Sequence, residues 1–336
     1  MEVLLVANRG EIARRVFRTA RDMGLLTVAV YTDGDARSPH VTEADAAVRI
    51  DSYLDVSAVV DAARRAHADA VHPGYGFLSE RGPAAHAVES AGITWVGPPA
   101  GVIEALGDKL RAKDLMATAG VPLLPGAALG GDPARWPAVA SEVGYPVLVK
   151  AAAGGGGRGM RLVASESELA ESVEGAAREA EAAFGDGTLF VERWLASPHH
   201  VEVQIMADSH GAVVHLGERE CSIQRRHQKV VEEAPSPTIG DSLRGRLTAA
   251  AVAGARAVGY VGAGTWEFLV DGEEFFFLEV NTRLQVEHPV TEAITGLDLV
   301  ELQLMVARGD RLPITQSDVG VNGWAVEGRL VAEDPA

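Results

Sequence analysis

Short apolar runs alternate with helical patterns through the first hundred residues, and this alternation limits the possible fold more than any other feature of the chain. An apolar run at 4–7 is followed by a helical pattern at 11–23 and by a second apolar run at 26–31. Further strands are expected near Ala70 and at 93–98. Strands that alternate with helices are typical of a parallel sheet with helices on both faces. The chain is therefore predicted to begin with a doubly wound α/β domain.

A stretch rich in proline, VPLLPG at 121–126, separates this part from the rest of the chain. After it, a strand pattern at 145–151 and an alanine- and glutamate-rich helical pattern at 166–184 indicate a small α/β unit. Longer strand patterns follow, and Asp271 with Gly272 marks an antiparallel hairpin. The predicted fold class is α/β and α+β, in four segments: an N-terminal domain at 1–100, linker helices at 101–122, a small domain at 123–195 and an α+β domain at 196–336.

Composition and charge narrow the possible functions. The chain has 336 residues and is 47% apolar. No apolar stretch approaches the roughly 20 residues that cross a bilayer, and no secretory signal opens the chain. The single cysteine, Cys221, excludes an internal disulfide framework and a cysteine-rich zinc site. A formal net charge of −17 opposes binding to nucleic acid or anionic membranes, although solubility alone also accounts for it. We expect a cytoplasmic protein that meets anionic ligands with local positive charge.

A lysine at the end of an apolar strand precedes a run of glycines. Lys150 is followed by glycines at 154–157 and at 159. Such a loop lets backbone N–H groups approach phosphate oxygens, while the lysine supplies a fixed charge. It is not a Walker loop, because no Gly-Lys-Ser/Thr ending follows. The residues themselves predict a phosphate site and leave a flexible surface hairpin as the alternative.

Hard oxygen ligands gather in the hairpin near residue 271. Glu267, Glu279 and Asn281 lie on neighbouring predicted strands, and Mg²⁺ prefers one or two carboxylates together with phosphates and water. Alternation puts Glu279 and Asn281 on one strand face, with Leu278 and Val280 pointing into the core. The alternative is a solvated polar face. The pattern favours a magnesium site.

The register of this hairpin decides whether the carboxylates can meet. A two-residue loop at Asp271 and Gly272 in a regular ladder would place Glu267 opposite Phe276 and on the other face from Glu279. A shared metal therefore requires an odd-length loop or a β-bulge. We predict one of these irregularities.

A cluster of charged residues follows the strand pattern near 216. It suggests a bound anion in an otherwise acidic chain, with a solvated charge run as the alternative. The cluster contains Glu218, Arg219, Gln224, Arg225, Arg226, His227 and Lys229. Cys221 within it is expected to be a buried or half-buried thiol and not a nucleophile. The segment 72–80, HPGYGFLSE, predicts a tight turn after a strand and no chemistry of its own.

Six motifs spread over almost the whole chain carry a family resemblance. They are ANRGEIA at 7–13, HPGYGFLSE at 72–80, GDK at 107–109, GGGGRGM at 154–160, SIQRRHQKVVEEAP at 222–235 and NTRLQVEHPVTE at 281–292. With these motifs the chain resembles the biotin carboxylase component of biotin-dependent carboxylases, in particular the α chains of acyl-CoA carboxylases. That family belongs to the ATP-grasp superfamily. The resemblance implies a Rossmann-like N-domain, a mobile lid domain and a C-domain that clasp ATP between two sheets.

The resemblance also implies a role for each matching residue. The residues expected to bind the nucleotide are Lys109, Lys150, Gly156, Gly157, Met160, Glu192, Arg193, Trp194, Leu195, His200, Gln224 and His227. Those expected to hold Mg²⁺ or Mn²⁺ are Glu267, Glu279 and Asn281. Those expected to hold bicarbonate are Lys229, Arg283, Gln285 and the Val286 amide. The catalytic set is Glu287 as general base, Arg329 as stabiliser of the biotin enolate, Lys229 and Arg283. Many family members have lysine in place of Arg193, a mild departure because that contact is largely through the backbone.

The implied reaction transfers a carboxyl group from bicarbonate to biotin through carboxyphosphate, with ATP as the phosphoryl donor. A biotin carboxyl carrier domain and a carboxyltransferase subunit are the implied partners, in a homo-oligomer when the chain is full length. No Met-Lys-Met biotinylation motif occurs, and the C-domain is expected to be incomplete after EGRLVAEDP. The final acyl acceptor is not readable. The alternatives are an ATP-binding fragment without turnover, the same domain of another biotin-dependent carboxylase, and a different ATP-grasp ligase.

Overall fold

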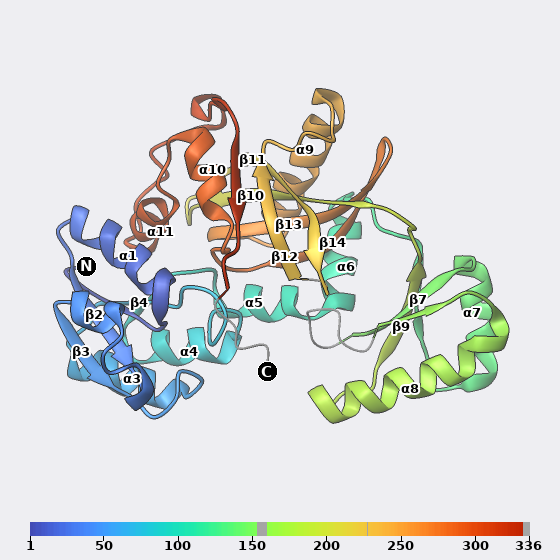
Figure 1. Ribbon diagram of the computed structural model, residues 1–336, viewed down its shortest axis with the longest axis horizontal. Coiled ribbons are helices and arrows are strands. Elements are labelled where there is room, and N and C mark those ends of the chain that lie inside the picture. The colour runs from blue at the N-terminus through green and yellow to red at the C-terminus, as the bar shows by residue number, and fades with distance from the viewer. Residues whose placement is uncertain (153–159, 227, 332–336) are drawn as a thin grey trace.

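The computed structural model describes residues 1–152, 160–226 and 228–331, and within them the chain forms three β-sheets (Figure 1). A parallel sheet holds the N-terminal strands at one end of the molecule, and a small antiparallel sheet lies at the opposite end. The largest sheet lies between them. No helix in the described ranges is both long and apolar enough to cross a bilayer. The predicted fold class, α/β followed by α+β, is confirmed.

The N-terminal sheet is parallel, as its alternating sequence predicts. Its strand order is β3-β2-β1-β4-β5, so the carboxyl ends of β1 and β4 lie side by side. Helix α1 packs on this sheet because Ile12, Val16 and Phe17 recur at helical spacing and are buried. The elements are β1 Val3–Val6, α1 Gly10–Asp22, β2 Leu26–Tyr31, η1 Asp33–Asp35, α2 Pro39–Glu43, β3 Ala46–Arg49, α3 Val56–Arg65, β4 Ala70–His72, α4 Gly82–Ser90 and β5 Thr94–Trp95.

Two short linker helices follow, as expected. They are α5 Ala100–Gly107 and α6 Lys109–Thr118. Asp108 separates them because its side chain accepts hydrogen bonds from the backbone N–H groups of Leu110 and Arg111. This cap begins α6 at Lys109, the residue expected to bind phosphate. The helix start therefore sets the position of that lysine.

The small antiparallel sheet has the order β6-β9-β7-β8. Its elements are β6 Gly126–Leu129, η2 Pro133–Arg135, α7 Trp136–Val143, β7 Val147–Ala151, β8 Arg161–Val163, α8 Glu166–Phe184 and β9 Leu189–Arg193. Helix α8 begins and ends where the sequence predicts. Strand β6, with the sequence GAAL, is not predicted because its small residues have low strand propensity. Pairing with β9 forms it.

The largest sheet is antiparallel, with the order β14-β13-β10-β11-β12-β15. Its elements are β10 His199–Ala207, β11 Val213–Arg225, β12 Gln228–Ala234, α9 Asp241–Ala257, β13 Gly262–Asp271, β14 Glu274–Asn281, α10 His288–Thr295, α11 Leu299–Ala307, η3 Gln316–Asp318 and β15 Ala325–Gly328. Strand β11 runs further than the predicted end near Glu220. Most of the charged segment after it is therefore strand, because the polar residues of β11 and β12 pair with each other.

The hairpin of β13 and β14 contains the predicted β-bulge. The two-residue loop lies one position later than predicted, at Gly272 and Glu273, because Asp271 still belongs to β13 and pairs with Glu274. Phe268 pairs with Phe277, but Glu267 pairs with Glu279. The extra residue is Leu278, which is half-buried at the bulge and does not point into the core as alternation predicts. The bulge thus brings the two carboxylates opposite each other.

Candidate functional site

A lysine on β12 lies among three carboxylates on one face of the largest sheet. Lys229 Nζ is 2.8 Å from Glu267 Oε1 and 2.6 Å from Glu287 Oε1, and it also contacts Glu202. Glu202 on β10 stands opposite Glu267 on β13, so both side chains lie on the same face. Burial would lower the pKa of Lys229, but the carboxylates raise it well above its usual range. The site is therefore a buried cluster of paired charges.

Two carboxylates of neighbouring strands are placed to share a divalent cation. Glu267 and Glu279 are register partners, and Asn281 Nδ2 donates to Glu267 Oε1 at 2.6 Å. Burial and repulsion by Glu267 raise the pKa of Glu279. A cation between the two carboxylates would relieve that repulsion. The hard oxygens of these three residues fit Mg²⁺ or Mn²⁺.

A histidine completes the surroundings of Glu267. His200 Nε2 lies 2.9 Å from Glu267 Oε2, and Gln224 Nε2 donates to His200 Nδ1 at 3.0 Å. Burial would raise the pKa of Glu267, but Lys229 and His200 lower it well below its usual range. Glu267 is therefore ionised at neutral pH, as a metal ligand must be. The predicted nucleotide residues His200 and Gln224 thus adjoin the predicted metal residues.

The residues expected to hold bicarbonate lie beside this cluster. Arg283 Nη2 donates to Asn281 Oδ1 at 3.0 Å, and Gln285 Nε2 donates to Glu267 Oε1 at 3.0 Å. Val286 is half-buried next to Glu287 in the chain. Arg283 Nε also lies 2.9 Å from Glu80 Oε2, which follows the turn after β4. The fold therefore brings the predicted anion site against the N-terminal sheet.

Glu287, the predicted base, precedes α10 and is almost fully buried. Arg329 Nη2 lies 2.9 Å from Glu287 Oε2, on the side away from Lys229. Burial would raise the pKa of Glu287, but Lys229, Arg219 and Arg329 lower it to about 2. Glu287 is thus a buried carboxylate whose low proton affinity is set by the cations around it.

The predicted nucleotide end is rich in lysine. Lys150 Nζ lies 2.5 Å from Glu192 Oε2, and Lys113 contacts the other oxygen of the same carboxylate. Burial and repulsion by other lysines, Lys109 among them, lower the pKa of Lys113 to about 7. Burial and Lys109 lower that of Lys150 to about 8. Crowded lysines with depressed pKa values favour an incoming polyanion, since its charge offsets their repulsion.

The strand connection after β9 is held by its backbone. Arg193 N donates to Pro125 O at 2.9 Å, and Trp194 N donates to Pro146 O at 3.0 Å. The Trp194 side chain is 37% exposed, and Leu195 and Met160 are half-buried. Partly exposed apolar side chains, such as those of Trp194 and Leu195 just after Glu192, would suit the flat face of a nucleotide base. The predictions for Gly156, Gly157 and His227 lie outside the described residues.

The structure corrects two predictions at single residues, Arg219 and Glu80. Arg219 was expected to help bind an anion, but it is fully buried and its guanidinium donates to Glu202 and to four further residues, Gln204, Thr265, Gln285 and Thr291. It is the register partner of Glu202, and both faces of β11 are covered at this point of the strand, so the guanidinium is enclosed. The segment 72–80 forms the predicted turn, yet its last residue Glu80 binds Arg283 and is not chemically silent. Cys221 is buried, as predicted.

Several site residues were missed, and some had a signal in the sequence. The chain contains four lysines, Lys109, Lys113, Lys150 and Lys229, and all of them lie at this site. That concentration points to Lys113. Glu202 stands inside an apolar strand, where a charged residue needs a buried partner. Glu80 had no local signal, because its partner is about 200 residues away along the chain.

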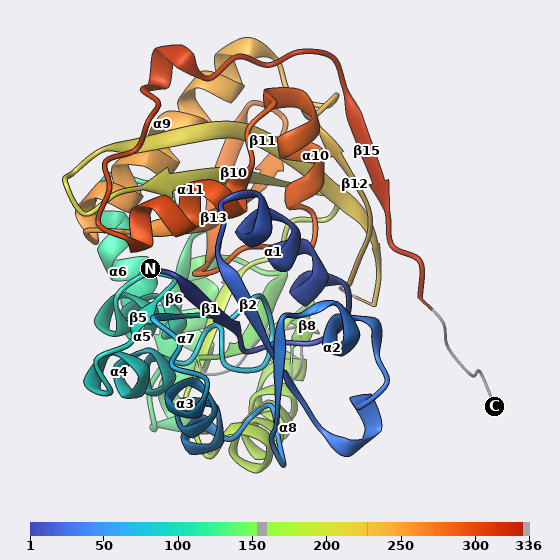
Figure 2. The ribbon, with the colours of Figure 1, turned by 90° about the vertical axis from the view of Figure 1, so that its left-hand side faces the viewer.

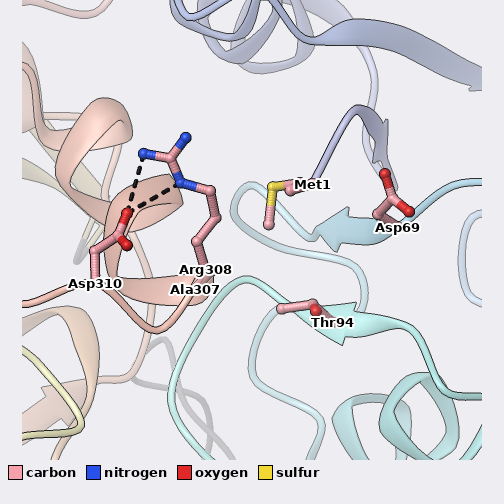
Figure 3. Close-up of a pocket in the computed structure, with 6 residues that line it drawn as sticks. All are labelled: Met1, Asp69, Thr94, Ala307, Arg308 and Asp310. Carbon is pink, nitrogen blue, oxygen red and sulfur yellow. Dashed lines mark hydrogen bonds and ion pairs between the residues drawn. The ribbon is translucent and has the colours of Figure 1, made fainter.

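A hollow elsewhere on the protein contains none of the predicted residues. Figure 3 shows Met1, Asp69 and Thr94 on one side of it, facing a segment in which Arg308 pairs with Asp310 at 3.1 Å. Its residues lie at the amino ends of β1, β4 and β5 and at the end of α11, whereas ligands of open parallel sheets bind at the carboxyl ends of the strands. The charged cluster of the largest sheet is therefore the stronger candidate site.

Two family models match almost all of the chain. The model described as "Biotin carboxylase, N-terminal domain" matches residues 1–103. The model described as "Carbamoyl-phosphate synthase L chain, ATP binding domain" matches residues 108–315. The two matches together cover the N-terminal sheet and the candidate site up to Glu287.

Relatives and solved structures agree with these models. The chain is 52% identical to the mitochondrial methylcrotonoyl-CoA carboxylase subunit alpha of Arabidopsis thaliana, covering 99% of this chain and 47% of that one. It is 51% identical to a biotin carboxylase of Halalkalibacterium halodurans, covering 99% and 75%. The biotin carboxylase domain dimer of the Hydrogenobacter thermophilus 2-oxoglutarate carboxylase, in complex with MgADP, ADP and bicarbonate, is 47% identical over 99% of this chain and 75% of that one, with a TM-score of 0.95. The chain spans about half the length of the carboxylase α subunits that it matches.

Proposed function

The chain belongs to the biotin carboxylase family of ATP-grasp proteins, and from that premise we propose that it uses MgATP and bicarbonate to carboxylate biotin on a carrier protein. The reaction proceeds through carboxyphosphate and forms the first half of an acyl-CoA carboxylase cycle. The final acyl acceptor is set by the subunit that takes the carboxyl group from biotin.

One observation carries this proposal. Lys109 is close enough to Lys150 and to Glu279 to shift the pKa of both groups. The lysine-rich end beside Glu192 and the carboxylate pair Glu267–Glu279 are therefore adjacent. A triphosphate needs lysines on one side and metal ligands on the other, and both lie within its reach here. A solvated polar face would not bury these groups.

The residues near Glu287 supply the chemistry at bicarbonate. Lys229, Arg283 and Gln285 would bind the anion, with the Val286 amide. When the anion attracts Lys229 and Arg329, Glu287 loses two of the three cations that keep its pKa low and can accept the bicarbonate proton. The deprotonated oxygen then attacks the γ-phosphorus of ATP and releases ADP. Glu267, Glu279 and Asn281 would hold the metal ion, which neutralises charge on the transferring phosphoryl group.

Arg329 would act in the second step. Carboxyphosphate breaks down to CO₂ and phosphate, and that phosphate takes the N1 proton of biotin. The guanidinium of Arg329 then stabilises the enolate oxygen before N1 attacks CO₂. Arg329 lies beside Glu287, so both steps would take place at the same cluster of charged residues.

The proposed function implies partners for the chain. A biotin carboxyl carrier domain presents biotin, and a carboxyltransferase subunit uses the product. The named relatives are carboxylase subunits, and one solved relative is a dimer. We infer a homo-oligomer for the full-length protein, and a cytoplasmic location remains a prediction from sequence.

Biotin-dependent ATP hydrolysis tests the proposal. We expect MgATP and bicarbonate to give ADP at a rate that rises with free biotin, together with labelled carboxybiotin from labelled bicarbonate. Glu267→Gln should abolish this rate, because it removes a metal ligand, and Glu274→Gln on the same hairpin should not, because Glu274 is exposed. Nucleotide binding without any bicarbonate-dependent turnover would favour a non-catalytic ATP-binding chain instead.

A further inference from the structure

Besides Glu287, a pair of carboxyl groups lies near Arg329 at the edge of the largest sheet. Glu232 on β12 and Glu327 on β15 are register partners in an antiparallel ladder, so both side chains project from one face. Figure 2 shows β15 alongside β12 at this edge. Directly opposite side chains have Cβ atoms about 5 Å apart. The two carboxyl groups are therefore within reach of each other.

Each of these groups has one buried oxygen without a hydrogen-bond donor among the described residues. Glu232 is fully buried, and its Oε1 accepts a hydrogen bond from Arg329 Nε at 2.6 Å. Within the described part of the chain, Glu232 Oε2 and Glu327 Oε2 are buried and have no hydrogen-bond partner. A buried oxygen without a donor is costly. One proton between two facing carboxylates satisfies both oxygens and removes one of two repelling charges.

Around the pair, burial and neighbouring carboxylates outweigh the neighbouring cations. Burial, Glu232 and Glu287 raise the pKa of Glu327 to about 7, although Arg329 and Arg219 oppose this. Burial also raises the pKa of Glu232 against Arg329 and Lys229. Arg219 and Lys229 are already bound to other carboxylates. Arg329 is therefore the cation that the Glu232–Glu327 pair shares with Glu287.

We propose that Glu232 and Glu327 share one proton and that this carboxyl pair positions Arg329 for biotin carboxylation. The inference rests on the proposed function, because it takes Arg329 as the group that stabilises the enolate. With the shared proton present, Arg329 faces one charge from the pair and one from Glu287. Loss of the proton adds a third negative charge, which holds the guanidinium more tightly and opposes an anionic enolate beside it. Glu232 and Glu327 are positioning residues and touch no substrate.

Infrared spectroscopy of the 336-residue chain tests for the shared proton directly. Below the pKa of Glu327, about 7, we expect the carbonyl stretch of a buried protonated carboxyl group, with a shift in D₂O. Glu327→Gln should abolish this band, because the amide donates to Glu232 Oε2 without a titrating proton. The control Glu233→Gln, on the opposite face of β12, should retain it. A wild-type spectrum without the band, or an unchanged band in Glu327→Gln, would overturn the proposal.

The pH profile of turnover tests the positioning role. In the wild type, kcat/KM for free biotin should fall as pH rises through about 7, and Glu327→Gln should lose this inflection while keeping activity above it. Glu233→Gln should keep the wild-type profile. If the wild type is active and Glu327→Gln leaves its pH profile unchanged, the proposal for the carboxyl pair is overturned, and the proposed function is not. A folded wild type without biotin-dependent turnover overturns the proposed function.

Discussion

At the scale of single residues, Glu287 combines burial with a low proton affinity. Lys229 and Arg329 bind its two oxygens, at 2.6 Å and 2.9 Å. A base with a pKa of about 2 is weak until these cations turn toward an anion. In the proposed mechanism Glu287 should therefore act only when bicarbonate is bound, which would restrict hydrolysis of ATP without carboxylation.

Glu287→Gln should leave nucleotide binding intact and abolish bicarbonate-dependent turnover. The amide keeps the shape of the side chain and removes the base, which is worth about 10²–10⁴-fold in rate. Steady-state ADP release and nucleotide titration of the same preparation measure both effects. Turnover at the wild-type rate would remove Glu287 from the mechanism.

Arg219 is a single residue on which the stability of the fold depends. It is fully buried, and Glu202 is its ionic partner at 2.6 Å. Arg219→Met should lower the free energy of unfolding by about 3–5 kcal/mol, because it leaves a buried carboxylate without that partner. Arg246→Met, in a pair that is half exposed, should cost less than about 1 kcal/mol. Chemical denaturation compares the two, and equal losses would contradict the role of Arg219.

At the scale of elements, helix α6 brings two lysines to the proposed nucleotide site. Its cap at Asp108 starts the helix at Lys109, and Lys113 follows one turn later on the same side. Strand β7 brings Lys150 to the same place from the small sheet. A helix start and a strand end thus form one cationic site.

MgATP binding at about pH 8 should be accompanied by proton uptake. The pKa values of Lys113 and Lys150, about 7 and about 8, are low in the free protein. Phosphate charge raises both, so the lysines bind protons as the nucleotide binds. Calorimetric titration in two buffers of different ionisation enthalpy measures the uptake, and Lys113→Met should reduce it. Proton release in these titrations would contradict the site.

At the scale of the whole molecule, Glu80 joins the N-terminal part to the largest sheet. It follows the turn after β4 and lies 2.9 Å from Arg283, one of the residues proposed to bind bicarbonate. The N-terminal part of the chain therefore contributes to the site through this ion pair. Arg15 provides a second connection, to Glu292 and Asp298 near α10 and α11.

Glu80→Gln should raise KM for bicarbonate several-fold, because Arg283 loses the charge that orients it. Nucleotide affinity should stay the same, and unfolding should shift by less than about 1 kcal/mol because the Glu80 side chain is 40% exposed. Glu89→Gln, exposed on α4, is the matched control. A KM equal to that of the control would show that Arg283 does not need Glu80.

Local sequence patterns were sufficient to predict most helices and strands and part of the candidate site. The period of two or of 3.6 residues is a property of neighbouring residues, so β2 and α8 are found with their observed bounds. The same alternation required the bulge that brings Glu267 opposite Glu279. The four lysines are also visible in the sequence, although Lys113 was not recognised.

The fold decided what distant residues do to one another. The sequence indicates that Arg219 is a cation at the surface. Only the pairing of β10, β11 and β13 buries it beside Glu202. The links from Glu80 to Arg283 and from Glu232 to Glu327 join residues far apart along the chain. No periodicity reports such pairs, because it records the face on which a side chain lies and not its partner. The charges of the site, and the pKa values they set, therefore depend on the tertiary structure.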